Sequence, residues 1–339
     1  MSDMRRRAFI TLLGGAVAAS AVSWPLAGRA QQPARVARIG YLVTGSRNSP
    51  EYRRIIDAFR QGLSQLGYRE GQNIVIEFRE AHGQTGRFAP LAAELVGRDV
   101  DVIIAPSTPA ARAARQATTT IPIVAFALGD AVADGLVSSL ARPGGNVTGL
   151  AFLAPELTAK RLQLFKDVVP TLSRVAALWD PGAFGERTTG EMLKTSEAAA
   201  AALGLQLQMI AIRSHEELDA AFSAMIGDRI EAVFVFPSPL FFSAQERIAA
   251  LALRHQLPSM FVYSDFVHLG GLLAYGASIA DLARRSAIYV DKILKGAKPG
   301  ELPVEQPIRF ELAINLRTAR TLGIVVSPNV QQLADEVIE

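Results

Sequence analysis

Short apolar runs alternate with segments of helical periodicity along almost the whole chain after residue 33. Residues 36–43 and 121–126 are largely apolar runs of strand length, and between such runs apolar residues recur three or four positions apart, as at Ile55, Phe59 and Leu63. Strands that alternate with helices in this way normally form a parallel sheet. The pattern therefore predicts an α/β protein with helices on both faces of its sheets.

The second half of the chain repeats this order, and short motifs recur in it at offsets of 131 to 139 residues. Pro-Ser-Thr-Pro at 106–109 corresponds to Pro-Ser-Pro at 237–239, and Asp-x-Val-x-x-Gly occurs at both 130–135 and 265–270. The other pairs are Arg-Val-Ala at 35–37 and 174–176, Leu-Gly at 66–67 and 203–204, and an apolar residue before proline at 121–122 and 257–258. Such ordered repetition indicates a duplicated unit.

We therefore expect two doubly wound parallel-sheet lobes joined by a hinge. The first lobe is predicted to comprise residues 33–150 and about 273–304, and the second residues 151–272 and about 305–339. A chain that crosses several times between two lobes forms a hinge, and hinged lobes with facing loops commonly close on a ligand.

The first 30 residues have the order of a secretion signal. The basic group Arg5-Arg6-Arg7 precedes an uncharged stretch at 8–28, and Gly28-Arg29-Ala30 presents small residues for cleavage after Ala30. Glycine, serine and proline within the uncharged stretch argue against a membrane anchor. The pattern Arg6-Arg7-x-Phe9-Ile10 is typical of the twin-arginine route, although Sec signals also contain paired arginines. We expect an exported, periplasmic protein.

Charge and cysteine content narrow the possible partners. Four of the 35 basic residues and one of the 32 acidic residues lie in the first 30 positions, so the remainder of the chain is balanced. A balanced chain gives no electrostatic reason to expect nucleic acid as a partner. The absence of cysteine excludes disulfides, thiolate metal sites and a lipid-modified cysteine. The four histidines show no metal-ligand spacing, and we expect neither cofactor nor metal.

The repeated motifs predict where a ligand binds, because ligands of open α/β sheets lie beyond the carboxyl ends of the strands. Ser107, Thr108, Pro109 and Ala110 begin a helix after a strand, and its free N–H groups and hydroxyls suit a carboxylate or phosphate. The equally weighted alternative is that Ser107 or Thr108 only caps its helix. We add the corresponding Ser238, and Thr44 and Ser46 after the first strand, as candidate ligand-binding residues.

Asp130 and Asp265 follow equivalent strands and are candidates for binding a ligand ammonium. Both suit a helix or turn cap, which is the default role of aspartate there. The ligand-binding interpretation is stronger for Asp265, because Tyr263 lies in the same loop. Together with the carboxylate site, this pairing describes an amino acid.

Aromatic residues at other strand ends are candidates for the walls of the cleft. They are Tyr41, Phe152, Trp179, Phe236 and Tyr275, of which we expect about two to face a ligand and the others to belong to the core. Trp179 is the preferred contact, because it precedes the loop that corresponds to Thr44–Ser46.

Several segments resemble the solute-binding proteins of ABC uptake systems, in the branch that includes tryptophan- and tyrosine-binding components. The most specific is Leu-Ala-Arg-Pro-Gly-Gly-Asn-Val-Thr-Gly at 140–149. Others are Arg-Ile-Gly-Tyr-Leu at 38–42, Glu-Gly-Gln-Asn-Ile at 70–74, Thr-Pro-Ala at 108–110, Gly-Gly-Leu at 270–272, Tyr-Val-Asp-Lys-Ile-Leu-Lys-Gly at 289–296 and Leu-Pro-Val-Glu-Gln-Pro at 302–307. The resemblance implies the type I periplasmic-binding-protein fold, with three crossovers, and a ligand carboxylate at the helix start of 108–110. Departures are Ala131 in place of a common proline and Asp265 in place of a frequent glutamate.

This resemblance implies a monomeric, non-enzymatic receptor that closes on a small-molecule solute and delivers it to an ABC permease in the inner membrane. The expected solute is an amino acid, preferably aromatic, or a related carboxylate. Two alternatives remain: a ligand-sensing subunit of a membrane sensor, and an exported enzyme that uses Asp130 or Asp265 as a base. The enzyme ranks lowest, since the sequence contains no recognisable nucleophile and base set.

Overall fold

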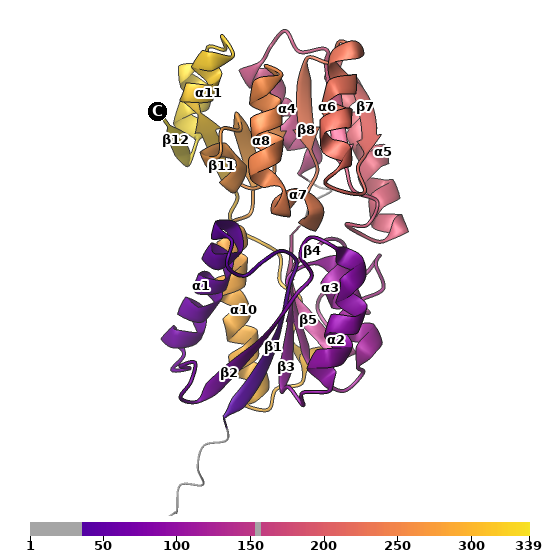
Figure 1. The fold of residues 1–339 in the computed structure, drawn as a ribbon, viewed down its shortest axis with the longest axis vertical. Coiled ribbons are helices and arrows are strands. Elements are labelled where there is room, and N and C mark those ends of the chain that lie inside the picture. Colours follow the sequence, from indigo (N-terminus) through magenta and orange to yellow (C-terminus); the bar gives the residue numbers. More distant parts are fainter. Residues whose placement is uncertain (1–35, 153–156) are drawn as a thin grey trace, which may run out of the picture. The chain divides into compact units, whose positions relative to one another are not determined.

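The computed structural model describes residues 36–152 and 157–339, which belong to one structural unit, Val36–Glu339. The predicted signal peptide, residues 1–30, lies outside the described residues. Within the described part of the chain, no helix is both long and apolar enough to cross a membrane. This unit contains two α/β lobes, which are distinguished by their separate sheets (Figure 1).

The first lobe contains a five-stranded, all-parallel sheet in the order β2-β1-β3-β4-β5. Helices α1 and α10 pack together on one face of the sheet, and α2 and α3 pack on the other (Figure 1). The bounds are β1 Ala37–Val43, α1 Pro50–Gln65, β2 Ile74–Glu80, the 3-10 helix η1 Thr85–Arg87, α2 Phe88–Val96, β3 Val102–Ala105, α3 Thr108–Ala117, β4 Ile123–Leu128, β5 Val147–Ala151 and α10 Ile279–Leu294.

Both faces of this sheet are buried, which explains the largely apolar runs in the sequence. Ile39 and Ile104 belong to the apolar cluster that includes α1 and α10, whereas Leu42 and Ile103 belong to the cluster that includes α2 and α3. Because side chains alternate across a strand, a sheet covered on both faces needs apolar residues at nearly every position.

The second lobe contains a seven-stranded sheet in the order β12-β11-β10-β9-β8-β6-β7. Helices α4 and α5 pack on one face, and α6 and α8 on the other (Figure 1). The bounds are α4 Thr158–Val168, β6 Arg174–Trp179, α5 Glu186–Ala202, β7 Gln206–Ala211, α6 Glu217–Gly227, β8 Ala232–Val235, α7 Pro239–Ser243, α8 Gln245–Arg254, β9 Ser259–Phe261, α9 Asp265–His268, β10 Leu273–Gly276, η2 Pro299–Glu301, β11 Glu311–Asn315, α11 Leu316–Thr321, α12 Pro328–Leu333 and β12 Glu336–Ile338.

The order β7-β6-β8-β9-β10 repeats β2-β1-β3-β4-β5, as the duplicated sequence motifs predict. The predicted α/β fold with two doubly wound lobes is therefore confirmed. One detail differs from a purely parallel sheet: β11 pairs antiparallel with β10.

Three connections join the lobes: β5 to α4, β10 to α10, and η2 to β11. The predicted boundary at about residue 273 needs correction, because β10 pairs with β9 in the second sheet and the chain crosses only after Gly276. The predicted return at about residue 305 is also early, since Glu305 still bridges to Leu150 beside β5. The partner of an apolar strand depends on tertiary pairing, which the strand's own residues do not specify.

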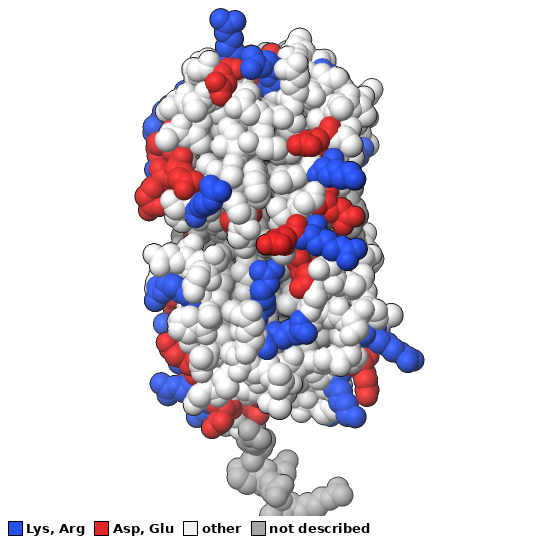
Figure 2. All heavy atoms as spheres, turned by 90° about the vertical axis from the view of Figure 1, so that its right-hand side faces the viewer, with Lys and Arg blue, Asp and Glu red and all other residues white. Residues whose placement is uncertain are grey.

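Basic and acidic side chains are interspersed over the face seen in Figure 2, and neither sign forms a continuous patch there. This distribution agrees with the balanced charge of the chain after the first 30 residues.

Candidate functional site

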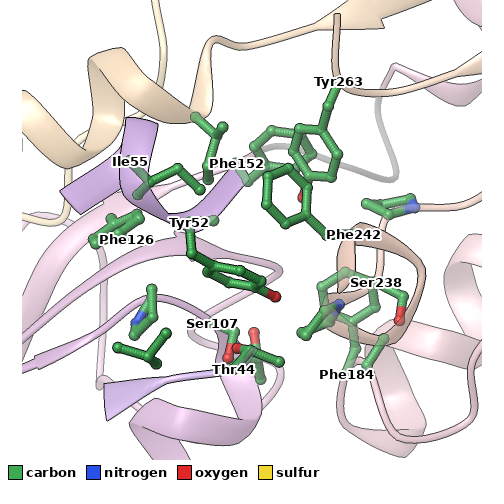
Figure 3. Close-up of a pocket in the computed structure, with 18 of the residues that line it drawn as sticks. Thr44, Tyr52, Ile55, Ser107, Phe126, Phe152, Phe184, Ser238, Phe242 and Tyr263 are labelled. Atoms are coloured by element: carbon green, nitrogen blue, oxygen red, sulfur yellow. The ribbon is translucent and has the colours of Figure 1, made fainter. Parts of the chain in front are cut away.

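A pocket lies where the carboxyl ends of strands from both sheets face each other (Figure 3). The first lobe contributes residues from the ends of β1, β3, β4 and β5 and from the beginnings of α1 and α10, and the second lobe contributes residues from the loops after β6, β8 and β9 and from α7. The lining residues are Tyr41, Val43, Thr44, Tyr52, Ile55, Pro106, Ser107, Thr108, Phe126, Ala127, Phe152, Ala183, Phe184, Pro237, Ser238, Pro239, Phe242, Tyr263 and Ile279.

The N-terminus of α3 forms one side of the pocket. Ser107 caps this helix by accepting a hydrogen bond from the Ala110 N–H group at 3.3 Å. Thr108 Oγ1 accepts one from the Gly129 N–H group at 3.1 Å, which ties the helix start to the loop after β4. Each hydroxyl acts as an acceptor in these bonds, so its own proton is available for a further bond. Capping and ligand binding are therefore compatible for both residues.

Ser238 holds the corresponding position in the second lobe. It caps α7 by accepting from the Leu240 N–H group at 2.9 Å, and its hydroxyl donates to Asp180 Oδ2 at 2.6 Å. The other oxygen of Asp180 accepts from the Gly182 N–H group at 2.7 Å. Burial raises the pKa of Asp180, and the two hydrogen bonds partly oppose this shift. Asp180 therefore connects the loop after β6 to the α7 cap directly behind the pocket wall.

The raised pKa of Asp180 predicts a pH dependence of stability. The folded protein retains the proton at pH values where the unfolded chain has lost it, so unfolding releases a proton in that window. The contribution of Asp180 to the free energy of unfolding should therefore rise as the pH falls towards the ordinary aspartate pKa, and should decrease as the pH rises through the folded-state pKa. Urea unfolding of the wild type and Asp180→Asn between pH 4 and 7 measures this difference.

The matched control for this experiment is Asp57→Asn, since Asp57 is exposed on α1. Its stability should follow the wild-type pH curve. A difference in the free energy of unfolding between the wild type and Asp180→Asn that stays the same at every pH would contradict the prediction. Such a difference would not depend on the protonation of Asp180.

Aromatic rings from both lobes meet inside the pocket. Tyr52 on α1 packs edge-on against Phe242 on α7 with 5.5 Å between ring centroids. Tyr263 lies 5.3 Å from Phe242 and 5.3 Å from Phe152. Edge and tilted arrangements at these distances are favourable for aromatic pairs. The same surfaces suit a planar apolar group of a ligand (Figure 3).

Polar contacts between the lobes flank the pocket. Asp134, in the loop after β4, accepts from the Gly185 N–H group at 2.9 Å and from the Thr188 hydroxyl at 2.7 Å, so a residue of the first lobe caps α5 of the second. Arg54 of α1 forms an ion pair with Asp265 at 2.6 Å. Burial raises the pKa of Asp265, and the Arg54 guanidinium opposes this shift.

Five of the predicted site residues line the pocket: Thr44, Ser107, Thr108, Ser238 and Tyr263. Pro109 and Ala110 are the two residues that follow Thr108 in the first turn of α3. Ser46 instead belongs to the turn after β1, where its side chain accepts from the Asn48 N–H group at 3.4 Å. Trp179 is half-buried against the core of the second lobe and does not line the pocket.

The two aspartates predicted to bind an ammonium are both engaged elsewhere. Asp130 is exposed, and its carboxylate accepts from the Val132 and Ala133 N–H groups at 3.0 and 2.9 Å, which is the default cap role. Asp265 faces Arg54 across the lobes and does not line the pocket. Asp130 and Asp265 hold equivalent positions in the two repeats but have different roles, because only Asp265 faces an arginine of the other lobe.

Several aromatic lining residues were not among the predicted ligand contacts: Tyr52, Phe126, Phe184 and Phe242. Tyr52 and Phe242 lie at the start of helices that follow strands, and Phe184 lies in the loop that opens α5. Aromatic residues in the first turns after parallel strands are the signal that identifies Tyr52, Phe184 and Phe242, whereas Phe126 lies on strand β4 itself. Among the five aromatics considered at strand ends, Tyr41 and Phe152 line the pocket.

Among the described residues, no group of histidine, aspartate and glutamate side chains is arranged to hold a metal ion. The chemistry of the pocket is that of hydroxyl groups, helix starts and aromatic rings. These groups bind small molecules without requiring a reactive side chain.

The family model for ABC transporter substrate binding proteins matches residues 46–338. The chain belongs to this family. It is 28% identical over 267 residues to a tyrosine-binding protein of Clostridioides difficile, a match that covers 78% of this chain and 75% of that protein. The resemblance to the tryptophan- and tyrosine-binding branch is thereby confirmed.

Solved structures of other substrate-binding proteins have the same fold. A Streptococcus pneumonia protein in complex with L-Trp is 27% identical, with a TM-score of 0.81 over 89% of this chain and 99% of that one. The ligand-free, open structure of a Clostridium difficile substrate binding protein is 25% identical over 89% and 99% of the two chains, but its TM-score is 0.63. Identity and coverage are nearly equal in the two comparisons.

Proposed function

We propose that this protein is the solute-binding component of an ABC uptake transporter and that it binds an aromatic amino acid or a related aromatic carboxylate between its lobes. The supporting observation is the pocket itself, which combines aromatic rings from both lobes with hydroxyls at two helix starts. Binding of L-Trp and tyrosine by relatives supports the same ligand class.

In this proposal the carboxylate of the solute lies at the start of α3, beside Ser107, Thr108 and Thr44. The helix dipole and hydroxyl donors of this region favour negative charge. The aromatic group of the solute lies against Phe242 and Tyr263, and Ser238 completes the wall on the second lobe. The three connections between the lobes act as the hinge, and the contacts of Asp134 and Arg54 hold the closed form.

We further propose that the protein is exported, is released from its signal after Ala30, and acts as a monomer in the periplasm. It then delivers its solute to a permease of the inner membrane. The basic head and uncharged stretch of residues 1–30 support export, and membership of the substrate-binding family supports the permease as the partner.

A thermal-shift screen of amino acids, purines, sugars and carboxylates tests the proposed function. A solute at 100 times its Kd should add about 2.7 kcal/mol to the free energy of unfolding. The proposal fails if no small solute raises the melting temperature, or if a solute is chemically converted.

The variant Asp265→Ala separates the two roles considered for this residue. Loss of the ion pair with Arg54 should weaken the binding of amino acids and of plain carboxylates by similar factors, because both depend on lobe closure. Selective loss of amino-acid binding would instead assign Asp265 to the ligand ammonium.

A further inference from the structure

The pocket is lined by neutral side chains only: among the described lining residues there is no aspartate, glutamate, lysine, arginine or histidine. The carboxylates around it do not line it. Asp180 accepts from Ser238 and Gly182, Asp265 pairs with Arg54, and Asp134 caps α5 through Oδ1, while its buried Oδ2 has no hydrogen-bond partner. A solute ammonium in this pocket would be buried without a facing negative charge, which is costly.

Hydrogen-bond donors are in excess at the first-lobe side of the pocket. The Tyr52 hydroxyl is buried and makes no hydrogen bond of regular geometry, and the Thr44 hydroxyl is its nearest polar neighbour. Figure 3 shows this hydroxyl pointing into the space between Ser107 and Ser238. Burial raises the pKa of Tyr52, so the hydroxyl keeps its proton and is able to donate.

Ser107 and Thr108 add two further donors. Their oxygens already accept N–H groups of Ala110 and Gly129, which leaves their protons free. Ser238 differs from them, because its proton is donated to Asp180. A group that meets three hydroxyl donors at a helix N-terminus must be an acceptor, and a carboxylate, with two oxygens that each accept more than one hydrogen bond, fits this set of donors.

The opposite side of the pocket is apolar and aromatic. Phe242 and Tyr263 present ring faces and edges to it, and Phe184 and Phe152 are buried beside them. Hydrophobic and aromatic walls of this kind suit a planar ring. The two sides of the pocket therefore match the two ends of one molecule.

We infer that the solute is an aromatic monocarboxylate without an α-ammonium group, and that the Tyr52 hydroxyl is a specificity-determining donor to its carboxylate. This inference rests on the proposed function and narrows it. Within a pair of solutes that share a ring and a carboxylate, the member that lacks the ammonium binds more tightly, because the neutral pocket offers the ammonium no counter-charge.

Calorimetric titration of the purified, dialysed protein with matched solutes tests the inference. The pairs are 3-phenylpropionate and L-Phe, 3-(4-hydroxyphenyl)propionate and L-Tyr, and 3-(indol-3-yl)propionate and L-Trp, with 2-phenylethylamine as the cationic control. For each pair that binds, we expect the Kd of the plain carboxylate to be at least about 10-fold lower than the Kd of the amino acid, in line with the cost of an unpaired buried charge. No binding is expected for 2-phenylethylamine.

Equal or tighter binding of the amino acids overturns the inference and leaves the proposed function intact. Binding of neither member of any pair also overturns the inference. The proposed function fails separately, if no solute of the wider screen shifts the melting temperature or if a solute is chemically converted.

Tyr52→Phe tests the placement of the carboxylate, since it removes one hydroxyl and leaves the ring that packs on Phe242. We expect the carboxylate's Kd to rise about 10-fold or more, with little change in melting temperature without ligand. Tyr68→Phe is the matched control, because that hydroxyl donates to Asp291 away from the pocket and its loss should leave the Kd unchanged. Equal Kd values for Tyr52→Phe and the wild type would overturn the role of Tyr52.

Discussion

Replacing Gly129 with valine is expected to weaken solute binding by about 100-fold while leaving each lobe folded. A Cβ atom at this position would lie 2.6 Å from Cδ1 and 2.9 Å from Cε1 of Phe184, which belongs to the other lobe. The backbone of Gly129 has no positive φ, so valine introduces no backbone strain there. The side chain therefore holds the lobes apart, and an overpacking penalty of up to about 3 kcal/mol corresponds to about 100-fold in Kd.

Calorimetric titration with the best solute from the screen measures this effect. Gly190→Ala is the matched control, because Gly190 is exposed within α5 and a Cβ atom there would meet nothing within 4 Å. The control should bind normally and gain about 0.5–1 kcal/mol of stability, as expected for glycine replaced within a helix.

Combining Gly129→Val with Phe184→Ala tests the mechanism directly. In the Phe184→Ala background, Gly129→Val should lower the affinity for the solute by less than it does in the wild type, because the ring that the valine would meet is absent. Independent, additive losses would show that contact between Gly129 and Phe184 does not limit closure.

Replacing Gly149 with alanine is expected to lower the free energy of unfolding by about 3 kcal/mol or more. Gly149 has a φ of +136°, and a Cβ atom there would lie 1.8 Å from the backbone oxygen of Ala125 on the neighbouring strand β4. Its own carbonyl accepts from the Glu305 N–H group at 3.0 Å, where the chain returns from α10 towards the second lobe. Backbone strain and the backbone clash add to each other, and rigid sheet atoms leave little room for relaxation.

Urea unfolding monitored by circular dichroism measures this loss. Gly145→Ala, four residues earlier, is the matched control, since a Cβ atom there would meet nothing within 4 Å. The control should remain within about 0.5 kcal/mol of the wild type, as surface substitutions usually do. A loss below about 1 kcal/mol for Gly149→Ala would contradict the geometric argument.

Much of the fold could be predicted from local sequence pattern. Largely apolar runs indicated strands buried on both faces, and helical periodicity between them indicated connecting helices. The repeated motifs indicated two lobes, and both sheets have the same strand order. These features are local or repeated, so each can be recognised in the sequence without knowing which residues pack against it in the folded protein.

The cap residues of the site were predictable for the same reason. Ser107 and Ser238 each follow a strand and precede a proline at the start of a helix, and both accept hydrogen bonds within that helix. The role of Asp180 was not predictable, because its partner Ser238 lies 58 residues further along the chain. Tyr52 and Phe242 meet only because α1 and α7 face each other across the pocket.

The sequence by itself determined the strands, the helices, their caps and the duplicated order of the two lobes, since each depends on neighbouring residues or on a repeat. Only the tertiary structure decided which carboxylates are available to a ligand. Asp130 and Asp265 occupy the same motif, yet Asp130 caps its own turn and Asp265 pairs with Arg54 of the other lobe. The physical reason is that charge pairing and desolvation depend on groups brought together across the chain, which local pattern does not specify.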